Sequence, residues 1–263
     1  MNENLVSPIA YGRTAEIYAW HPDQVLKLFY DWFEIEAIEY ELRIAHELQS
    51  VGLPVPHVGE LIQVNGRKGL IYQRINGVSM FEMLSRKPWK IIYYARRMAE
   101  LHARMHASTI QANIPPLHQK LKYKIHHAVT LPDVLRSKTL DLLEKMPQGD
   151  RLCHGDFHPG NIMVTEQGEV IIDWIDSALG NPMADLARTT IIIMGVIGSQ
   201  TKVPFPKWFI RLFHRLYIRT YFSLLEGDKN EYSRWLPIVS AARLSENIIE
   251  MEPWLIAQVE QGL

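Results

Sequence analysis

The sequence predicts an α+β protein with a small antiparallel β lobe that contains one helix and a larger, mainly helical lobe. Short runs of β-branched and aromatic residues, separated by turn residues, fill most of the first 75 positions. One stretch with helical spacing interrupts them, and helical periodicity dominates after residue 76. We therefore expect an N-terminal lobe at residues 1–75 and a C-terminal lobe at residues 76–263.

Two hairpins and one helix account for the expected small lobe. The hairpin strands are 17–20 with 24–30, and 61–64 with 69–75. Asn65-Gly66 joins the second pair and is the strongest short-range signal for a two-residue turn. Helical spacing covers 34–50 and stops before Gly52 and Pro54. We expect this helix to pack against a curled antiparallel sheet.

Helices are expected through most of the larger lobe, with one hairpin among them. A helix begins at Pro88, and its apolar residues recur at spacings of three and four, which predicts a stripe facing a core. Further helices are expected at 133–146 and 207–225, and helices dominate after Asp185. The hairpin strands are 162–165 and 170–173, joined by a turn at Gln167-Gly168.

Composition and charge limit the classes of function. Lys plus Arg is 28 and Asp plus Glu is 29, which gives a net charge of −1 and argues against a protein that coats nucleic acid. No apolar run approaches the roughly 18 residues that span a bilayer, and the first twelve residues lack a secretory signal pattern. Cys153 is the only cysteine, so no internal disulfide can form. A cytoplasmic protein without membrane attachment is expected.

The most informative segment is 152–162, followed by the strand that ends at Asp173. Its glycines and proline exclude a regular helix, so its polar side chains lie on a shaped loop. Asp156 and Asn161 on this loop can converge with Asp173 at the end of the hairpin. Such an incomplete set of oxygen ligands suits Mg²⁺, which takes its other ligands from water and nucleotide phosphates.

Three motifs follow one another in the second half of the chain. They are His154-Gly155-Asp156 with Asn161, then Ile172-Asp173-Trp174, then Asp185-Leu186-Ala187. Together they resemble the signature of the aminoglycoside phosphotransferase and choline kinase superfamily, whose members are distant relatives of protein kinases. The resemblance covers nearly the whole chain and implies a bilobal, protein-kinase-like fold. It departs from protein kinases at Trp174 and Ile175, so a flip of that segment is not implied.

The resemblance also implies an activity and a role for each motif residue. It implies a small-molecule kinase that uses ATP or GTP and Mg²⁺, with Asp156 accepting or orienting the proton of the acceptor hydroxyl. Asn161 and Asp173 would hold the metal ion, while His154 and Asp185 would support the loop. For Asp176 two roles stay open, a ligand to metal or substrate and a helix cap.

Lys27 and Glu41 form the expected centre of the small lobe. Lys27 lies inside an apolar strand, where an unpaired ammonium would be costly. Glu41 falls on the inward stripe of the helix at 34–50, so the two side chains can pair. By the resemblance, this lysine would contact the α- and β-phosphates. The alternative is that Lys27 extends outward and Glu41 is a surface residue.

Two further segments of the small lobe are expected to contact nucleotide by the same resemblance. Gly12 and Thr14 lie in the segment 11–17, which resembles a reduced glycine loop over the phosphates. The segment 72–77 resembles the hinge between lobes, and there Gln73 and Ile75 would contact the adenine through their backbone.

Three other functions deserve comparison. Zinc hydrolysis would use His154 with His158, or His102 with His106, but the glycines and proline of the loop break the helical metalloprotease pattern. We expect His102 in a core stripe and His106 on a surface turn. Cys153 is expected to be a small buried residue rather than a nucleophile. A kinase relative that binds nucleotide without catalysis is the remaining alternative.

The acceptor is expected to be a small hydroxylated molecule bound by the C-terminal lobe. Between residues 226 and 263 seven acids oppose three bases, which favours a cationic acceptor such as an amino sugar. Trp235 or Trp254 could contact the quaternary ammonium of a choline-like alcohol, the alternative acceptor. These acids are also explained by a solvated surface, which is the commoner situation.

Overall fold

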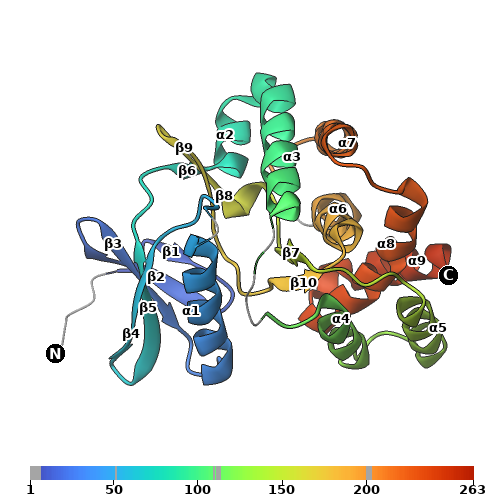
Figure 1. Cartoon of the computed structure of the whole chain (residues 1–263), viewed down its shortest axis with the longest axis horizontal. Helices are drawn as coiled ribbons and strands as arrows, with labels where there is room; N and C mark the ends of the chain where they lie inside the picture. The colour runs from blue at the N-terminus through green and yellow to red at the C-terminus, as the bar shows by residue number, and fades with distance from the viewer. Residues whose placement is uncertain (1–6, 51, 109, 111–113, 200–202) are drawn as a thin grey trace. The chain divides into compact units, whose positions relative to one another are not determined.

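The computed structural model describes residues 7–50, 52–108, 110, 114–199 and 203–263, so the first six residues of the expected N-terminal lobe lie outside it. The chain forms two compact units (Figure 1). The first contains the chain up to Ser79 together with Asn161–Ile175, and the second contains Met80–Gly160 with Asp176–Leu263. The functional division expected at residue 75 stays a prediction.

The first unit is built on a five-stranded antiparallel sheet in the order β1-β2-β3-β5-β4. The strands are β1 (Ala10–Tyr11), β2 (Ala15–His21), β3 (Gln24–Phe29), β4 (Val58–Val64) and β5 (Arg67–Gln73). Both expected hairpins are present, β2 with β3 and β4 with β5. Asn65 and Gly66 join the second hairpin with φ of 50° and 85°, the positive values that a type I′ turn requires.

Helix α1 (Ile35–Ser50) packs against this sheet, as the sequence pattern predicts (Figure 1). Ile38 of α1 belongs to a buried cluster with Ala15, Phe29 and Leu70 from three of the strands. Side chains alternate between the two faces of a strand, so Lys27 shares the face of Phe29. Lys27 therefore lies on the face of the sheet that α1 covers.

A second, three-stranded sheet completes the first unit. It has the order β6-β8-β9, with β6 (Val78–Ser79), β8 (Ile162–Thr165) and β9 (Gly168–Ile171). The hairpin expected at 162–173 is thus present, although its second strand begins and ends two residues earlier than predicted, so that Asp173 follows the strand rather than ending it. The Ile171 N–H donates to the Pro54 carbonyl at 2.7 Å. This bond holds the end of β9, from which the chain leads to Asp173.

The second unit is mainly helical. Its helices are α2 (Met80–Arg86), α3 (Ile91–Ala107), α4 (Leu117–His126), α5 (Asp133–Glu144), α6 (Pro182–Gly198), α7 (Lys207–Leu224), α8 (Lys229–Arg243) and α9 (Glu252–Gly262). Helix α6 is buried on nearly all sides and carries Asp185 and Arg188 into the core. Two short strands, β7 (Arg151–Cys153) and β10 (Ala178–Gly180), pair antiparallel. The mixed fold with an antiparallel sheet and a helical part is confirmed.

Helix α4 is an element that the sequence analysis missed. Leu117, Leu121 and Ile125 are its buried residues, and their spacing of four is an apolar stripe that the sequence does contain. Lys120 and Lys124 lie one helical turn apart on the same helix.

Among the described residues, no helix is both long enough and apolar enough to cross a membrane.

Candidate active site

In the first unit, Lys27 of β3 and Glu41 of α1 form the ion pair expected from the sequence. The Lys27 Nζ lies 2.7 Å from Glu41 Oε1, and both side chains are nearly buried. The Tyr72 hydroxyl of β5 donates to the same oxygen at 2.9 Å. The alternative, an outward lysine and a surface glutamate, is wrong. Tyr72, which fixes the carboxylate, was not predicted because a tyrosine in a strand is usually explained by packing alone.

Asp173 lies beside the same lysine, with its Oδ1 3.2 Å from Lys27 Nζ. Burial lowers the pKa of Lys27, but the Glu41 and Asp173 carboxylates outweigh it, and the net pKa lies above the ordinary value. Lys27 is therefore charged at any physiological pH. Asp173 has φ of +65°. Positive φ is uncommon outside glycine, although asparagine and aspartate adopt it more readily than other residues, and it is concentrated at functional sites.

Asn161 ends a short 3₁₀ turn (Pro159–Asn161) and is almost buried. Its carbonyl accepts a hydrogen bond from the Ile172 N–H at 3.0 Å, directly before Asp173. This backbone hydrogen bond thus holds the segment that contains Asn161 next to the segment that contains Asp173. The two predicted oxygen donors of the metal site therefore belong to neighbouring segments of one unit.

The other predicted nucleotide contacts also lie in the first unit. The Gly12 N–H donates to the Ala15 carbonyl at 2.8 Å, and the Thr14 carbonyl accepts from the Tyr30 N–H at 3.0 Å, so the expected phosphate loop is a tight turn before β2. Gln73 ends β5 and Ile75 follows it. Their contact with a nucleotide stays a prediction.

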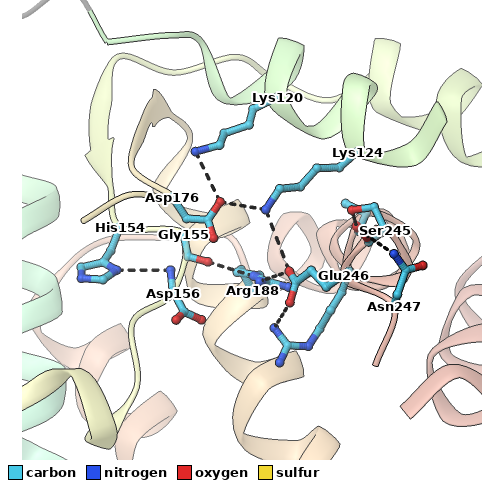
Figure 2. Close-up of polar contacts among 12 residues, drawn as sticks. Lys120, Lys124, His154, Gly155, Asp156, Asp176, Arg188, Ser245, Glu246 and Asn247 are labelled. Atoms are coloured by element: carbon cyan, nitrogen blue, oxygen red, sulfur yellow. Dashed lines mark hydrogen bonds and ion pairs between the residues drawn. The ribbon is translucent and has the colours of Figure 1, made fainter. Parts of the chain in front are cut away.

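In the second unit, the loop after β7 has a conformation that only glycine accommodates. Gly155 has φ of +78°, and a Cβ there would lie 2.4 Å from the Asp176 carbonyl oxygen. His154 is fully buried, and its Nδ1 accepts a hydrogen bond from the Asp156 N–H at 3.2 Å (Figure 2). His154 therefore lies behind the loop, while Asp156 retains partial exposure of its carboxylate.

Two neighbouring side chains, those of His158 and Arg188, keep Asp156 ionised. The Gly160 N–H donates to His158 Nδ1 at 3.0 Å, so the proton of a neutral His158 resides on Nε2, 3.6 Å from Asp156 Oδ2. Burial raises the pKa of Asp156, but His158 and then Arg188 outweigh it and hold the pKa well below its usual range. At neutral pH the Asp156 side chain is a carboxylate.

The carboxylate of Asp185, on α6, holds this loop by accepting hydrogen bonds from the backbone of the loop. Its Oδ2 accepts the His154 N–H at 2.7 Å and its Oδ1 accepts the Gly155 N–H at 2.8 Å. Oδ2 is also bonded to Nε2 of His102 and of His106, at 3.1 and 3.2 Å. Burial raises the pKa of Asp185, but the bonds from the two histidines outweigh it, and the pKa lies well below the ordinary value.

Both ring nitrogens of each of the two histidines on α3 have a hydrogen-bond partner. Because the carboxylate only accepts, both Nε2 atoms carry protons, and Nδ1 of each ring accepts from a tyrosine of α7. These hydroxyls belong to Tyr217, bonded to His102, and Tyr221, bonded to His106 at 2.6 Å. The expected surface position of His106 is wrong: the residue is 2% exposed, because α3 continues to Ala107 and places His106 one turn after His102.

We expect acid to destabilise the fold through His102. Burial, and then the neighbouring His106, lowers the pKa of His102 to about 3. Unfolded histidine titrates near ~6.5, so between these values the unfolded chain binds a proton that the folded chain does not. The free energy of unfolding should therefore fall as the pH drops below about 6.5, by up to about 1.4 kcal/mol per pH unit.

Denaturant unfolding between pH 7 and 5 measures this slope. The pKa of Asp185 is lowered in the fold, so Asp185 changes the free energy of unfolding only below its unfolded pKa of about 4. Between pH 7 and 5 the slope therefore comes from histidines. In His102→Gln, whose amide can still donate to Asp185, the slope should be smaller than in wild type. Equal slopes in the two proteins would show that His102 does not carry the effect.

A charged cluster adjoins the loop on its other side (Figure 2). Asp176 Oδ1 lies 2.8 Å from Lys124 Nζ and 3.4 Å from Lys120 Nζ. Of the two roles left open for Asp176, the helix cap therefore does not fit, and the role of ligand to metal or substrate stays a prediction. Arg188 donates through Nε to the Gly155 carbonyl at 2.9 Å and pairs with Glu246. The sequence analysis missed both lysines, Arg188 and Glu246 as neighbours of the loop.

Cys153, at the end of β7, is fully buried, as expected. Burial, and then the charge of Asp185, raises the pKa of the Cys153 thiol well above its ordinary value. The thiolate, which is the nucleophilic form, is thus disfavoured. Cys153 serves packing rather than chemistry.

Comparison with known proteins gives the same family that the motifs resemble. Residues 23–201 match the phosphotransferase enzyme family. Among solved structures, an aminoglycoside-3′-phosphotransferase of type VIII is 17% identical over 92% of this chain and 91% of its own, with a TM-score of 0.64. A choline/ethanolamine kinase family protein from Mesorhizobium loti is 16% identical over 97% and 86%, with a TM-score of 0.62.

A third solved structure is an amicoumacin kinase in complex with AMP-PNP, Ca²⁺ and Ami. It is 13% identical to this chain, covers 98% of this chain and 87% of its own, and has a TM-score of 0.63. These likenesses show a shared fold. The family match spans most of the chain and includes the loop with Asp156 and the motif with Asp185. The chain belongs to the phosphotransferase enzyme family.

Proposed function

We propose that the protein is a magnesium-dependent kinase that transfers the γ-phosphoryl group of ATP or GTP to a hydroxyl of a small acceptor. The observation that supports this best is the ammonium of Lys27, fixed between Glu41 and Asp173 inside the first unit. A nearly buried lysine held by one buried carboxylate and one half-exposed carboxylate is suited to bind a metal-bound polyphosphate.

The donor set around Asp173 fits a magnesium ion. The Asp173 carboxylate is 42% exposed, and the backbone of Asn161 is bonded to Ile172, the residue before Asp173. Mg²⁺ prefers such oxygen donors and retains water and phosphate oxygens as its other ligands. Asn161 and Asp173 would hold the ion, which would supply charge neutralisation at the triphosphate.

The chain's own residues would perform the remaining steps. Lys27 would bind the non-transferred phosphates, and its bond to Glu41 would keep its position. Asp156 is ionised and would orient the acceptor hydroxyl and accept its proton as the oxygen attacks the γ-phosphorus. Asp185 would hold the loop in the shape that presents Asp156.

A kinase named among the structural relatives supports the choice of ATP as the nucleotide. The amicoumacin kinase was solved with AMP-PNP and Ca²⁺, an ATP analogue with a divalent metal ion. An amino-sugar acceptor, and a choline-like alcohol as its alternative, stay predictions. Trp235 is fully buried, and most of the acids between 226 and 263 lie on the exposed surface, so these residues give little support to a cationic acceptor.

Mass analysis of products tests the proposed function. Purified protein is incubated with Mg²⁺, with ATP or GTP, and with a broad set of hydroxyl compounds. The expected result is a product heavier than its acceptor by one phosphoryl group, formed only when Mg²⁺ and nucleotide are both present. Tight binding of magnesium nucleotide with no product from any acceptor would instead favour the non-catalytic alternative.

A further inference from the structure

Arg188 of α6 contacts the loop that carries Asp156, and the proposed mechanism does not use it. Its side chain is only 9% exposed, and burying a guanidinium is costly unless it is paired and hydrogen-bonded. Its Nε donates to the Gly155 carbonyl at 2.9 Å, and its other end pairs with Glu246 (Figure 2). Arg188 therefore links the loop to the short 3₁₀ helix Leu244–Glu246.

Arg188 and Asp185 hold opposite sides of the same glycine. They lie three residues apart on α6, so both side chains are on one face of the helix. Asp185 accepts the N–H groups of His154 and Gly155. Arg188 donates to the Gly155 carbonyl, which belongs to the peptide group that leads into Asp156. One turn of α6 thus fixes the backbone on both sides of Gly155.

The far end of the Arg188 guanidinium is also fixed. The Glu246 carboxylate that pairs with it has two further cationic partners, Arg243 at 3.2 Å and Lys124 at 3.9 Å. Bonds at both ends restrict the planar guanidinium to one orientation. Its Nε is therefore preorganised to hold the Gly155 carbonyl.

The charge of Arg188 also acts on Asp156. Burial raises the pKa of Asp156, whereas His158 on the same loop and Arg188 on α6 lower it. Asp176, before β10, is a further charged neighbour and raises the pKa. Arg188 thus favours the carboxylate form of Asp156, which is the form that can receive a proton.

The cavity beside Arg188 is too small for an acceptor. Its walls include Gly155, Asp185 and Arg188, and its volume of about 30 Å³ holds about one water molecule. A role through the loop therefore fits Arg188 better than direct contact with a substrate.

We propose that Arg188 is a positioning residue for phosphoryl transfer: by holding the Gly155 carbonyl and placing a fixed positive charge behind the loop, it orients the Asp156 carboxylate toward the acceptor hydroxyl. The inference rests on the proposed kinase function and adds one residue to its machinery. A displacement of about 1 Å in such an arrangement can lower a rate about 100-fold. The loss should appear in kcat rather than in KM, because nucleotide and acceptor would still bind.

Two substitutions test the contribution of Arg188. Arg188→Gln removes the charge, and Arg188→Lys keeps the charge but lacks the planar fork. Steady-state kcat and KM are measured with an acceptor that wild type phosphorylates, and the Kd of magnesium nucleotide is measured separately. We expect kcat to fall about 100-fold in Arg188→Gln and about 10-fold in Arg188→Lys. The KM for the acceptor and the Kd of nucleotide should stay close to wild type.

The pH profile is a readout that a purely structural role would not move. Loss of the Arg188 charge raises the pKa of Asp156, so its protonated, inactive form is present at higher pH than in wild type. The acid limb of kcat/KM should therefore move to higher pH in Arg188→Gln and return in Arg188→Lys. The neighbours His158 and Asp176 are present in all three proteins.

Arg136→Gln is the matched control. Arg136 of α5 is also largely buried, with 18% exposure, and it also donates to main-chain carbonyls. These belong to Ala128 and Leu131, at 2.9 and 2.8 Å, in the segment between α4 and α5. Denaturant unfolding should show a loss of stability in both glutamine variants. Only Arg188→Gln should lose kcat and shift its pH profile.

The outcomes separate the inference from the proposed function. A wild-type kcat in folded Arg188→Gln, or in Arg188→Lys should the glutamine variant not fold, would overturn the inference and leave the kinase function intact. An equal loss of kcat in Arg136→Gln, or an acid limb unmoved in Arg188→Gln, would reduce Arg188 to a structural role and also overturn it. Absence of product from every acceptor with the wild-type protein would refute the kinase function itself.

Discussion

Replacement of Asp156 by asparagine is expected to lower kcat for phosphoryl transfer by about 10²- to 10⁴-fold, the usual contribution of a positioned general base. The side chain keeps its size but loses the carboxylate that would accept the hydroxyl proton. Nucleotide affinity should change little, because Asp156 is expected to act on the acceptor. Steady-state rates with a working acceptor and the Kd of magnesium nucleotide measure the two effects separately.

Asp150→Asn is the matched control for this substitution. Asp150 precedes β7, close to Asp156 in sequence, and its side chain is 89% exposed. The same chemical change there should leave both kcat and nucleotide Kd at wild-type values. Near-normal transfer by Asp156→Asn would remove Asp156 from the chemistry, and a parallel loss of nucleotide affinity would place it in the nucleotide site instead.

Asp173→Ala is expected to weaken binding of magnesium nucleotide by on the order of 100-fold or more. Loss of a residue that only orients a metal ligand already costs about 10- to 100-fold in metal affinity, and Asp173 is expected to be a ligand itself. Calorimetric titration with nucleotide, with and without Mg²⁺, measures the loss. Binding of metal-free nucleotide should be affected far less, because Lys27 keeps its bond to Glu41.

The backbone of Asp173 allows a second variant that separates metal binding from stability. Asparagine tolerates positive φ better than alanine, so Asp173→Asn should retain most of the free energy of unfolding, whereas Asp173→Ala should lose about 1 kcal/mol. Both variants lack the charge that binds the metal ion. Wild-type magnesium dependence in Asp173→Asn would contradict the assignment of Asp173 as a metal ligand.

The ion pair of Lys27 and Glu41 could be predicted because it follows from the two-residue alternation of a strand and the 3.6-residue turn of a helix. Strand alternation places Lys27 on the face of Phe29, and helical spacing places Glu41 beside Ile38. The same reasoning failed at His106, which was predicted on a surface turn but lies buried near the end of α3. A position near a helix end changes from surface to core when the helix gains one turn, and local sequence rarely determines such an end.

The charged cluster beside the loop with Asp156 could not be predicted from the sequence. Each of its charged residues belongs to a segment in which a lysine, arginine or acid is ordinary on a solvated surface. Only the packing of α4, α6 and the short 3₁₀ helix after α8 brings Lys120, Lys124, Arg188 and Glu246 to one place. The count of acids between 226 and 263 pointed to a negative site because it ignored where each side chain lies.

The brace at Asp185 has a consequence for how this enzyme can change during evolution. The carboxylate holds the loop by two main-chain N–H groups and is itself held from the interior by a pair of imidazoles. The shape of the loop is thus held from the interior of the second unit, and not by groups on its exposed side. Descendants can exchange those outer side chains, and so acquire new acceptors, while the geometry of phosphoryl transfer is inherited unchanged.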